Sequence, residues 1–214
     1  MHQSQLSRRR LLQVSATIGA VSLAVPAALH ASTLARPLAA PTPAAMATSP
    51  ILAAARAGLQ RAGARVAHLD VVAVADFAQP SSHPRFHLVD TASGRITSLL
   101  VAHGRGSDPS HCGWLSRFSN AAGSDCTSEG DFLTAADYVG KHGRSIRLSG
   151  LEATNSNAES RGIVVHNAPY VSAQMVRDHG VLGRSEGCFA LSAADLPQVL
   201  QRMGPGRLLV STKL

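Results

Sequence analysis

Residues 162–166 read Gly-Ile-Val-Val-His, and residues 183–188 read Gly-Arg-Ser-Glu-Gly-Cys. The first stretch is a strong apolar run that predicts a buried strand ending at His166. The second stretch places Cys188 behind two glycines and three polar residues, which is typical of a tight turn whose backbone approaches a ligand. Together they predict a rigid strand that presents a histidine and a turn that presents a cysteine.

The rest of the chain beyond residue 50 is predicted to be mostly β, with short helices (an α+β domain). A continuous apolar run at 71–75 is typical of a buried strand, and alternating apolar residues on both sides of Gly94 predict a β-hairpin. Apolar residues at helical spacing before Gly63 predict a first helix, and Ser192 with Asp195 predicts a capped helix near the end. The predicted strands are 71–75, 86–90, 95–101, 144–148, 162–165 and 207–211. The predicted helices are 51–62, 175–178 and one that Ser192 caps and that runs to Met203.

The composition excludes several classes of protein. Of the 214 residues, 45% are hydrophobic and 15% are charged, which is too apolar for a disordered chain, and only the N-terminus has an apolar run that approaches a membrane span. Aromatic residues make up 4%, so a nucleic-acid surface built on stacked rings is not expected. Without residues 1–35 the net charge of +7 falls to +4, from 17 basic and 13 acidic residues. A thinly spread positive charge suits an anionic polymer and does not by itself indicate nucleic acid.

The N-terminus is typical of an export signal. Three arginines at 8–10 precede a weakly apolar stretch at 14–29, and small residues follow. The arginine pair resembles a twin-arginine signal, and the alternative is an uncleaved anchor helix. We expect an exported protein of the periplasm or cell envelope, with no stable membrane span after signal removal. The expected organisation is a signal at 1–35, an Ala/Pro-rich linker at 36–50 and one domain at 51–214.

The chain has three cysteines, Cys112, Cys126 and Cys188. Cys112 and Cys126 lie 14 positions apart in a long polar segment at 104–130, where a disulfide would close the loop and add about 3 kcal/mol of stability. The alternative is a pair of free thiols. A bridge between these two cysteines leaves Cys188 as the unpaired thiol.

Cys188 and His166 have the residue types of a nucleophile and its base. A thiolate attacks a carbonyl, and a neighbouring imidazole accepts the thiol proton. The oxyanion that forms needs donors already in place, for which the backbone N–H groups of Gly187 and Cys188 are candidates. The alternatives are an ordinary surface histidine and a structural cysteine.

Six segments carry a resemblance to a known family. They read Val-Ala-His-Gly at 101–104, Phe-Ser-Asn at 118–120, Tyr-Val-Gly-Lys-His-Gly at 138–143, Leu-Ser-Gly-Leu-Glu at 148–152, Ser-Arg-Gly-Ile-Val-Val-His at 160–166 and Leu-Gly-Arg-Ser-Glu-Gly-Cys at 182–188. In this order they resemble the L,D-transpeptidases of bacterial cell walls (the YkuD-type catalytic domain), and most closely the branch of murein L,D-transpeptidase catalytic domain proteins. The resemblance covers about residues 51–212.

The resemblance implies a twisted, mixed β-sheet catalytic domain that performs acyl transfer on peptidoglycan. Cys188 would form a thioester with a stem peptide and release D-alanine, His166 would accept and return the proton, and an amine of a second stem would resolve the thioester to a 3–3 crosslink. Gly187 and Ser185 would belong to the catalytic turn. The expected partners are peptidoglycan stem peptides and not nucleic acid, no metal or organic cofactor is required, and the sequence does not indicate an oligomeric state. The substrate-binding candidates are Arg161, Arg184, Tyr138 and His142, with structural roles as the alternative.

Two positions differ from the pattern of the wider family, which reads Ser-His-Gly-Cys followed two positions on by Arg or Asn. This chain has Glu186 in place of the histidine and Ala190 in place of the Arg or Asn. Three other functions stay open. They are an L,D-carboxypeptidase or other hydrolase with the same residues, a catalytically inactive cell-wall-binding relative, and a metal protein that uses Cys188 with His166, His179 or His142, although the close ligand spacing of zinc sites is missing.

Overall fold

Eight strands and three α-helices make up residues 49–214, the part of the chain that the computed structural model describes. The predicted export signal and residues 36–48 of the predicted linker lie outside the described residues. Within 49–214 the helices are too short or too polar to cross a lipid bilayer. The strands are β1 (Val71–Asp76), β2 (Phe86–Asp90), β3 (Ile96–Leu99), β4 (Gly130–Gly140), β5 (Gly143–Gly150), β6 (Val164–Asn167), β7 (Phe189–Leu191) and β8 (Leu208–Thr212). The helices are α2 (Pro50–Ala62), α3 (Ala173–His179) and α4 (Leu196–Arg202), with short 3₁₀ segments η1 (Gly63–Arg65) and η2 (Arg105–Ser107).

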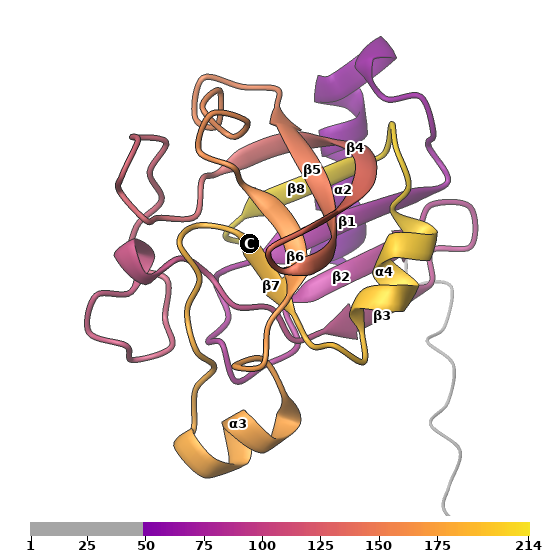
Figure 1. The fold of residues 1–214 in the computed structure, drawn as a ribbon. Helices are drawn as coiled ribbons and strands as arrows, with labels where there is room; N and C mark the ends of the chain where they lie inside the picture. Colours follow the sequence, from indigo (N-terminus) through magenta and orange to yellow (C-terminus); the bar gives the residue numbers. More distant parts are fainter. Residues whose placement is uncertain (1–48) are drawn as a thin grey trace, which may run out of the picture. The chain divides into compact units, whose positions relative to one another are not determined.

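The C-terminal strand lies in the middle of the sheet. The strand order is β3-β2-β1-β8-β4-β5-β6-β7, so β8 joins the first three strands to the later ones (Figure 1). β8 runs parallel to β1, with Val72 opposite Leu208, and antiparallel to β4, with Phe132 opposite Leu209. The sheet therefore depends on pairing between residues 136 positions apart in the sequence.

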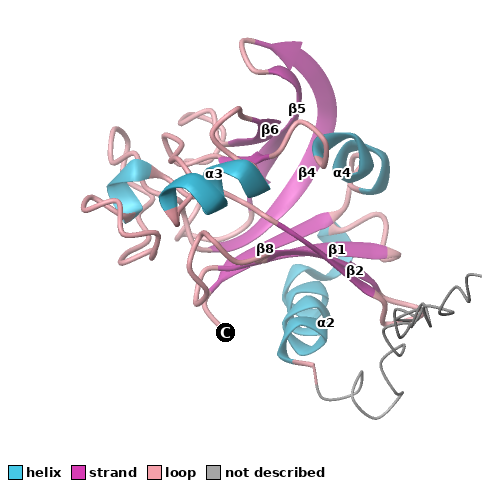
Figure 2. Ribbon diagram, turned by 90° about the horizontal axis from the view of Figure 1, so that it is seen from below, coloured by secondary structure: helices cyan, strands magenta, loops and turns pink. Residues whose placement is uncertain are grey.

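One face of β1 and β8 is covered by α2. Val72 and Val74 pack against this helix, whereas Ala73 between them lies in the core on the other face, as the two-residue period of a strand requires. A Cβ on Gly58 of α2 would lie 2.7 Å from a methyl carbon of Val210, so the glycine lets the helix approach β8 closely. α4 lies on the opposite face of the sheet (Figure 2).

β4 and β5 curve strongly, so the second half of the sheet folds over the first (Figure 2). The register between β4 and β5 shifts between Thr134 and Asp137, where a bulge increases the twist. The two halves share one core, in which Phe132 on β4 meets Phe189 on β7 edge to face, with ring centroids 5.5 Å apart. This arrangement places β6 and β7, which carry the candidate residues, at the end of the sheet.

The structure confirms the α+β class and the twisted mixed sheet. The strand at 71–75, the hairpin of β2 and β3 and the terminal strand lie where the sequence predicts them. The apolar pattern does not predict β4 and β7, because β4 carries Ala-Ala-Asp in place of an alternating pattern and β7 has only three residues. α2 begins at Pro50, one residue earlier than predicted, with Ser49 as its N-cap.

The predicted disulfide between Cys112 and Cys126 is wrong, since both cysteines are free. Cys112 is exposed, on a turn that the Asp108 carboxylate caps by accepting the N–H groups of Cys112 and Gly113 at 3.0 and 2.8 Å. Cys126 is fully buried, with its Sγ packed against Gly106. One thiol is therefore exposed and the other is enclosed in the core, and hydrogen bonds of the Asp108 carboxylate hold the turn at Cys112 in place of a crosslink.

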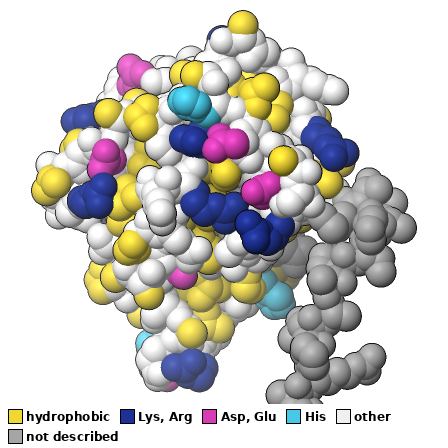
Figure 3. Space-filling model, turned by 90° about the vertical axis from the view of Figure 1, so that its right-hand side faces the viewer, with side chains coloured by type: hydrophobic (Ala, Val, Ile, Leu, Met, Phe, Trp, Pro, Cys, Tyr) yellow, Lys and Arg dark blue, Asp and Glu magenta, His cyan; other side chains and the backbone are white. Residues whose placement is uncertain are grey.

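Charged side chains are interspersed and not segregated. On the face shown in Figure 3, the Lys and Arg side chains of the described residues lie among acidic and hydrophobic ones and form no continuous basic surface. The spread of positive charge in the sequence is therefore also found on this face of the folded protein.

Candidate active site

His166 and Cys188 lie at adjacent strands and line one cleft. β6 and β7 are parallel, with His166 opposite Ala190, and Cys188 directly precedes β7. The cleft has a volume of about 590 Å³ and is also lined by Tyr138 and Val164. The fold thus brings to one cleft two residues that are 22 positions apart in the chain.

The His166 side chain is almost fully buried, and the backbone sets its tautomer. Nδ1 lies 2.7 Å from the carbonyl oxygen of Asn167, so Nδ1 carries the hydrogen and donates it, which leaves Nε2 as the free acceptor. The ring of His142 stacks on that of His166 at a centroid distance of 4.2 Å. Burial lowers the pKa of His166, the bond to the Asn167 carbonyl opposes this, and the charge of Lys141 lowers the pKa further. His166 is therefore a neutral base at pH 7.

The Cys188 thiol is protonated in the resting site. Burial raises its pKa, whereas a backbone hydrogen bond and two nearby cations, Lys141 and Arg161, lower it. Its Sγ lies 3.5 Å from the carbonyl oxygen of Gly162 and donates to it. A poorly ionised thiol needs a base to become a nucleophile, and His166, which is neutral and lines the same cleft, is the candidate for that role.

Ser185 holds the turn that carries Cys188. Its hydroxyl donates to the carbonyl oxygen of Cys188 at 2.7 Å and accepts the N–H of Gly187 at 3.2 Å. Gly187 has a φ of +115°, and a Cβ there would lie 2.6 Å from the carbonyl oxygen of Cys126, so only glycine fits. Because Ser185 takes the Gly187 N–H, the Cys188 N–H is the one oxyanion candidate that makes no hydrogen bond within 49–214.

Arg161 and Arg184 line the cleft and hold its walls. The Arg161 guanidinium donates to three oxygens on the segment 119–128, at distances of 2.5 to 2.9 Å. Arg184 donates to the carbonyl oxygens of Asp108 and of the proline that follows it. Both arginines therefore have structural roles, and their binding of a substrate stays a prediction.

Tyr138 and His142 lie at the hairpin between β4 and β5, on the rim of the cleft. The Tyr138 ring lies under the guanidinium of Arg147, with 3.8 Å between Cζ and the ring centroid. His142 is exposed, and its carbonyl oxygen accepts the side-chain amide N–H of Asn167 at 3.1 Å. These contacts hold the hairpin against β6. Binding of a substrate by either side chain stays a prediction.

Comparison of the sequence with protein-family profiles identifies the family to which the chain belongs. The sequence profile of the L,D-transpeptidase catalytic domain (YkuD_2) matches residues 44–211. The chain belongs to this family. The L,D-transpeptidases are enzymes, so the cleft of this domain is its candidate active site.

Solved structures show similarity at low identity. An L,D-transpeptidase from Mycobacterium smegmatis is 16% identical, with a TM-score of 0.41, and the match covers 66% of this chain and 58% of that one. L,D-transpeptidase 3 from Mycobacterium tuberculosis in complex with a faropenem-derived adduct is 16% identical, with a TM-score of 0.43 and coverage of 67% and 60%. A variant of the helical cell shape determining protein from Campylobacter jejuni is 13% identical, with a TM-score of 0.43 and coverage of 77% and 57%. The match spans less than two thirds of the length of these proteins, and similarity at this level carries no residue's role to this chain. No curated protein sequence matches significantly.

Lys141 and Tyr170 are among the residues of this L,D-transpeptidase domain that line the cleft without a prediction from the sequence. Lys141 lies at the hairpin tip, and its charge lowers the pKa of both His166 and Cys188. Tyr170 follows β6, and burial is the main cause that raises its pKa to about 12. Lys141 lies inside the segment 138–143, and Tyr170 lies four positions after His166. Both residues could have been predicted by including the polar residues within, or a few positions after, the segments that carry the family resemblance.

The two positions that differ from the wider L,D-transpeptidase pattern have distinct places. Glu186 is exposed at the rim of the cleft, with its carboxylate 3.5 Å from the guanidinium of Arg105. Ala190 is fully buried opposite His166, and its carbonyl oxygen accepts the N–H of Ala102 at 2.9 Å. Position 190 therefore belongs to the core of this domain, whereas position 186 faces the cleft.

A buried polar network lies behind the nucleophile turn of this L,D-transpeptidase domain. Arg85 is fully buried and donates to Nδ1 of His103 at 2.7 Å, and Nε2 of His103 faces Asp108 at 3.4 Å. The carbonyl oxygen of His103 accepts the N–H of Ser185 at 2.9 Å. Burial lowers the pKa of Arg85 to about 9 and that of His103 to about 4. The network therefore anchors the segment on which the turn rests.

Proposed function

We propose that the chain is an exported cysteine acyltransferase that acts on peptidoglycan stem peptides and forms 3–3 crosslinks. The observation that carries the proposal is a single cleft lined by the Cys188 thiol and by a neutral His166 whose Nε2 is free. Membership of the L,D-transpeptidase family supports the same chemistry. A family that acts on the cell wall works outside the cytoplasm, which agrees with the predicted signal at 1–35.

In the first half-reaction, Sγ of Cys188 attacks the carbonyl carbon that joins the third stem residue to D-alanine. The thiol proton passes to Nε2 of His166, and the π electrons of the carbonyl move to its oxygen. The Cys188 N–H donates to this oxyanion. As the tetrahedral intermediate collapses, the C–N bond breaks, the amine of D-alanine takes the proton from His166, and a thioester remains on Cys188.

In the second half-reaction, an amine of a second stem attacks the thioester carbonyl. Neutral His166 accepts the amine proton as the new C–N bond forms, the C–S bond breaks, and the proton returns to Sγ of Cys188. The new peptide bond joins two third residues and is a 3–3 crosslink. Water in place of the amine gives hydrolysis, which is the reaction of an L,D-carboxypeptidase.

The charge of the cleft suits an anionic substrate. Its lining contains the basic residues Arg105, Lys141, Arg161 and Arg184 and one acidic residue, Glu186. A stem peptide that ends in D-alanine has a C-terminal carboxylate, which this excess of positive charge attracts. Lys141 makes no hydrogen bond or ion pair within 49–214, so its ammonium group is available for that carboxylate.

Intact-protein mass spectrometry after incubation with a carbapenem tests the nucleophile. The thiol opens the strained lactam ring and keeps the acyl group, so we expect one adduct on the full-length wild type and none on Cys188→Ala. Cys112→Ala is the matched control, because Cys112 is an exposed free thiol outside the cleft, and this variant keeps the adduct. An adduct that survives in Cys188→Ala, or no adduct on wild type, contradicts the proposal.

Incubation with a stem tetrapeptide separates the remaining functions. Release of D-alanine together with a crosslinked dimer supports the transpeptidase. Release of D-alanine with only the tripeptide as the second product supports the carboxypeptidase. A protein that binds the tetrapeptide and releases no D-alanine is a cell-wall-binding relative.

A further inference from the structure

The two backbone N–H groups predicted to bind the oxyanion at Cys188 are not both available. That of Gly187 donates to the hydroxyl of Ser185 at 3.2 Å, so that of Cys188 is left. In serine proteases two N–H groups bind the corresponding oxyanion. A side chain of the cleft that has a hydrogen-bond donor without a protein partner is therefore suited to supply the second hydrogen bond.

Tyr170 has such a donor. The residue follows β6 and lines the cleft together with Cys188. Within 49–214 its hydroxyl makes no hydrogen bond, and it is not one of the polar atoms that the fold encloses without a partner, so it is open to the cleft. A substrate oxygen can therefore accept a hydrogen bond from Tyr170 without breaking one within the protein.

The Tyr170 ring rests on the segment that leads to the nucleophile. The N–H of Gly183 donates to the carbonyl oxygen of Tyr170 at 3.0 Å. A Cβ on Gly183 would lie 2.5 to 2.8 Å from three carbon atoms of the tyrosine side chain, so the glycine makes room for the ring. Two residues further on, Ser185 holds the turn of Cys188. Tyr170 is therefore fixed against the same short segment that carries the thiol.

The electrostatics of Tyr170 agree with a donor near the reacting sulfur. Burial, and after it the negative charges of Cys188 and Glu186, raise the pKa of the phenol to about 12. Because the interaction of two charged groups weakens with distance, the influence of Cys188 indicates that the phenol lies near the sulfur. At pH 7 the hydroxyl keeps its proton, so it can donate a hydrogen bond but cannot act as a base.

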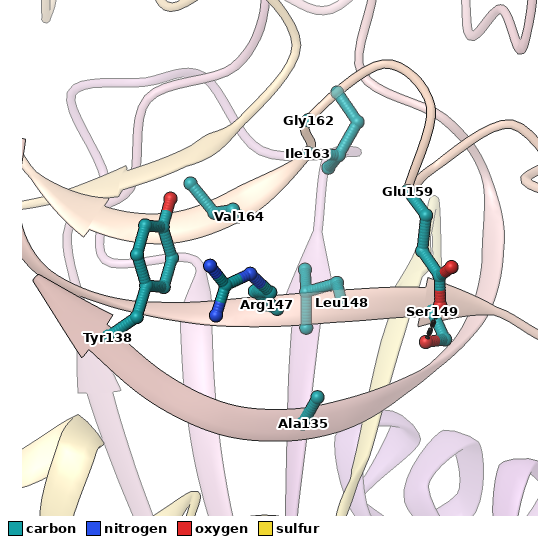
Figure 4. A pocket seen from close by; sticks show the side chains of 9 residues that line it. All are labelled: Ala135, Tyr138, Arg147, Leu148, Ser149, Glu159, Gly162, Ile163 and Val164. Carbon is teal, nitrogen blue, oxygen red and sulfur yellow. Dashed lines mark hydrogen bonds between the residues drawn. The ribbon is translucent and has the colours of Figure 1, made fainter. Parts of the chain in front are cut away.

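The other tyrosine of the chain, Tyr138, is engaged elsewhere. Its side chain lies beside Arg147 in a neighbouring cavity of about 400 Å³ between β4, β5 and β6 (Figure 4). The guanidinium stacks on the ring, with 3.8 Å between Cζ and the ring centroid. Tyr138 therefore belongs to the hairpin, whereas Tyr170 belongs to the surroundings of the thiol.

We propose that the Tyr170 hydroxyl donates a hydrogen bond to the oxyanion, beside the Cys188 N–H, and is thus a further catalytic residue. The inference rests on the proposed function. As the bond between Sγ and the carbonyl carbon forms, the π electrons move to the oxygen, and the hydroxyl donates to it. When the C–N bond breaks, the electrons return and the C=O bond forms again. The phenol keeps its proton throughout, and the proton transfer stays with His166.

The rate of acylation by a carbapenem tests this role in the full-length protein. Tyr170→Phe keeps the ring on Gly183 and loses only the hydroxyl, so we expect the urea midpoint of unfolding to stay the same. The maximal acylation rate should fall about 100-fold, at the lower end for loss of one oxyanion donor, because water can enter the open cleft. The carbapenem concentration that gives half of this rate should not change, since the oxyanion exists only after the attack.

Alkylation of Cys188 by iodoacetamide is the control reaction. Here Sγ attacks a saturated carbon and displaces iodide, so no oxyanion forms, and we expect equal rates in wild type and Tyr170→Phe. Both reactions are measured in the Cys112→Ala background, which removes the exposed thiol. 3-Fluorotyrosine at position 170 keeps the hydroxyl as a more acidic donor, so it should restore acylation to at least the wild-type rate.

The inference is overturned if Tyr170→Phe is acylated as fast as wild type, if it loses acylation and alkylation to the same extent, or if the 3-fluorotyrosine variant stays slow. A larger fall of the maximal acylation rate in Tyr138→Phe than in Tyr170→Phe overturns it as well. A failure of the proposed function has a different signature, since wild type then forms no carbapenem adduct although iodoacetamide alkylates Cys188.

Discussion

Replacing Arg161 by methionine tests what holds the nucleophile turn in place. The guanidinium donates to the carbonyl oxygens of Ser119 and Cys126 and to the hydroxyl of Ser128, at 2.9, 2.5 and 2.7 Å. The carbonyl oxygen of Cys126 in turn lies directly against Gly187. The substitution therefore removes three hydrogen bonds and leaves the wall behind the turn without its anchor.

We expect Arg161→Met to lower the free energy of unfolding by about 2–4 kcal/mol. A hydrogen bond from a charged donor contributes about 1.5–3 kcal/mol, so three such bonds set an upper bound. Two effects reduce the loss. Burial lowers the pKa of Arg161, because desolvating its charge has a cost, and the Ser128 hydroxyl keeps its bond to the Ser119 carbonyl at 3.0 Å. For a domain of this size, the expected loss lowers Tm by about 5–15 °C.

Urea unfolding followed by circular dichroism measures this change. Arg56→Met is the control, because Arg56 is exposed on α2 and methionine has a similar helix propensity. Arg161→Lys keeps the charge but cannot donate to all three oxygens at once, so we expect an intermediate loss of the free energy of unfolding. We expect acylation of Cys188 to be slower in both Arg161 variants. If the free energy of unfolding of Arg161→Met lies within about 0.5 kcal/mol of that of the control, the anchoring role is refuted. A rise in KM without a loss of stability would instead assign Arg161 to substrate binding.

Three other changes have specific expected outcomes. Gly187→Ala places a Cβ 2.6 Å from a carbonyl oxygen at a φ of +115°, so we expect a loss of about 1–3 kcal/mol and no carbapenem adduct, and an unchanged Tm would contradict the clash. The charge of Lys141 lowers the pKa of Cys188, and that of Glu186 raises it. The pH midpoint of Cys188 alkylation by iodoacetamide should therefore move upward in Lys141→Gln and downward in Glu186→Gln. Midpoints that move in the same direction in both variants would refute this. Burial lowers the pKa of His103 from 6.5 to about 4, so the unfolded chain takes up the proton first and stability is lost as the pH falls from 6.5 towards 4. Urea titrations across this window should show a smaller loss in His103→Gln, and an identical loss would exclude His103 as a cause.

Short-range patterns account for much of the observed secondary structure. The apolar run at 71–75, Gly63 after α2 and Ser192 with Asp195 before α4 each act within a few residues, and the structure has a strand and two helices there. The pairing of side chains through space could not be predicted from such local patterns. The spacing of Cys112 and Cys126 favours a bridge, yet the fold exposes the first thiol and buries the second.

The sequence by itself determines a strand that carries His166 and a glycine at position 187, because strand preference and backbone freedom are properties of the residues themselves. Only the tertiary structure decides that β8 lies between β1 and β4 and that Arg161 anchors a wall of the cleft. The physical reason is that the role of a charged side chain depends on which oxygen atoms lie within its reach. Those atoms belong to segments distant in sequence, which burial of a common core brings together.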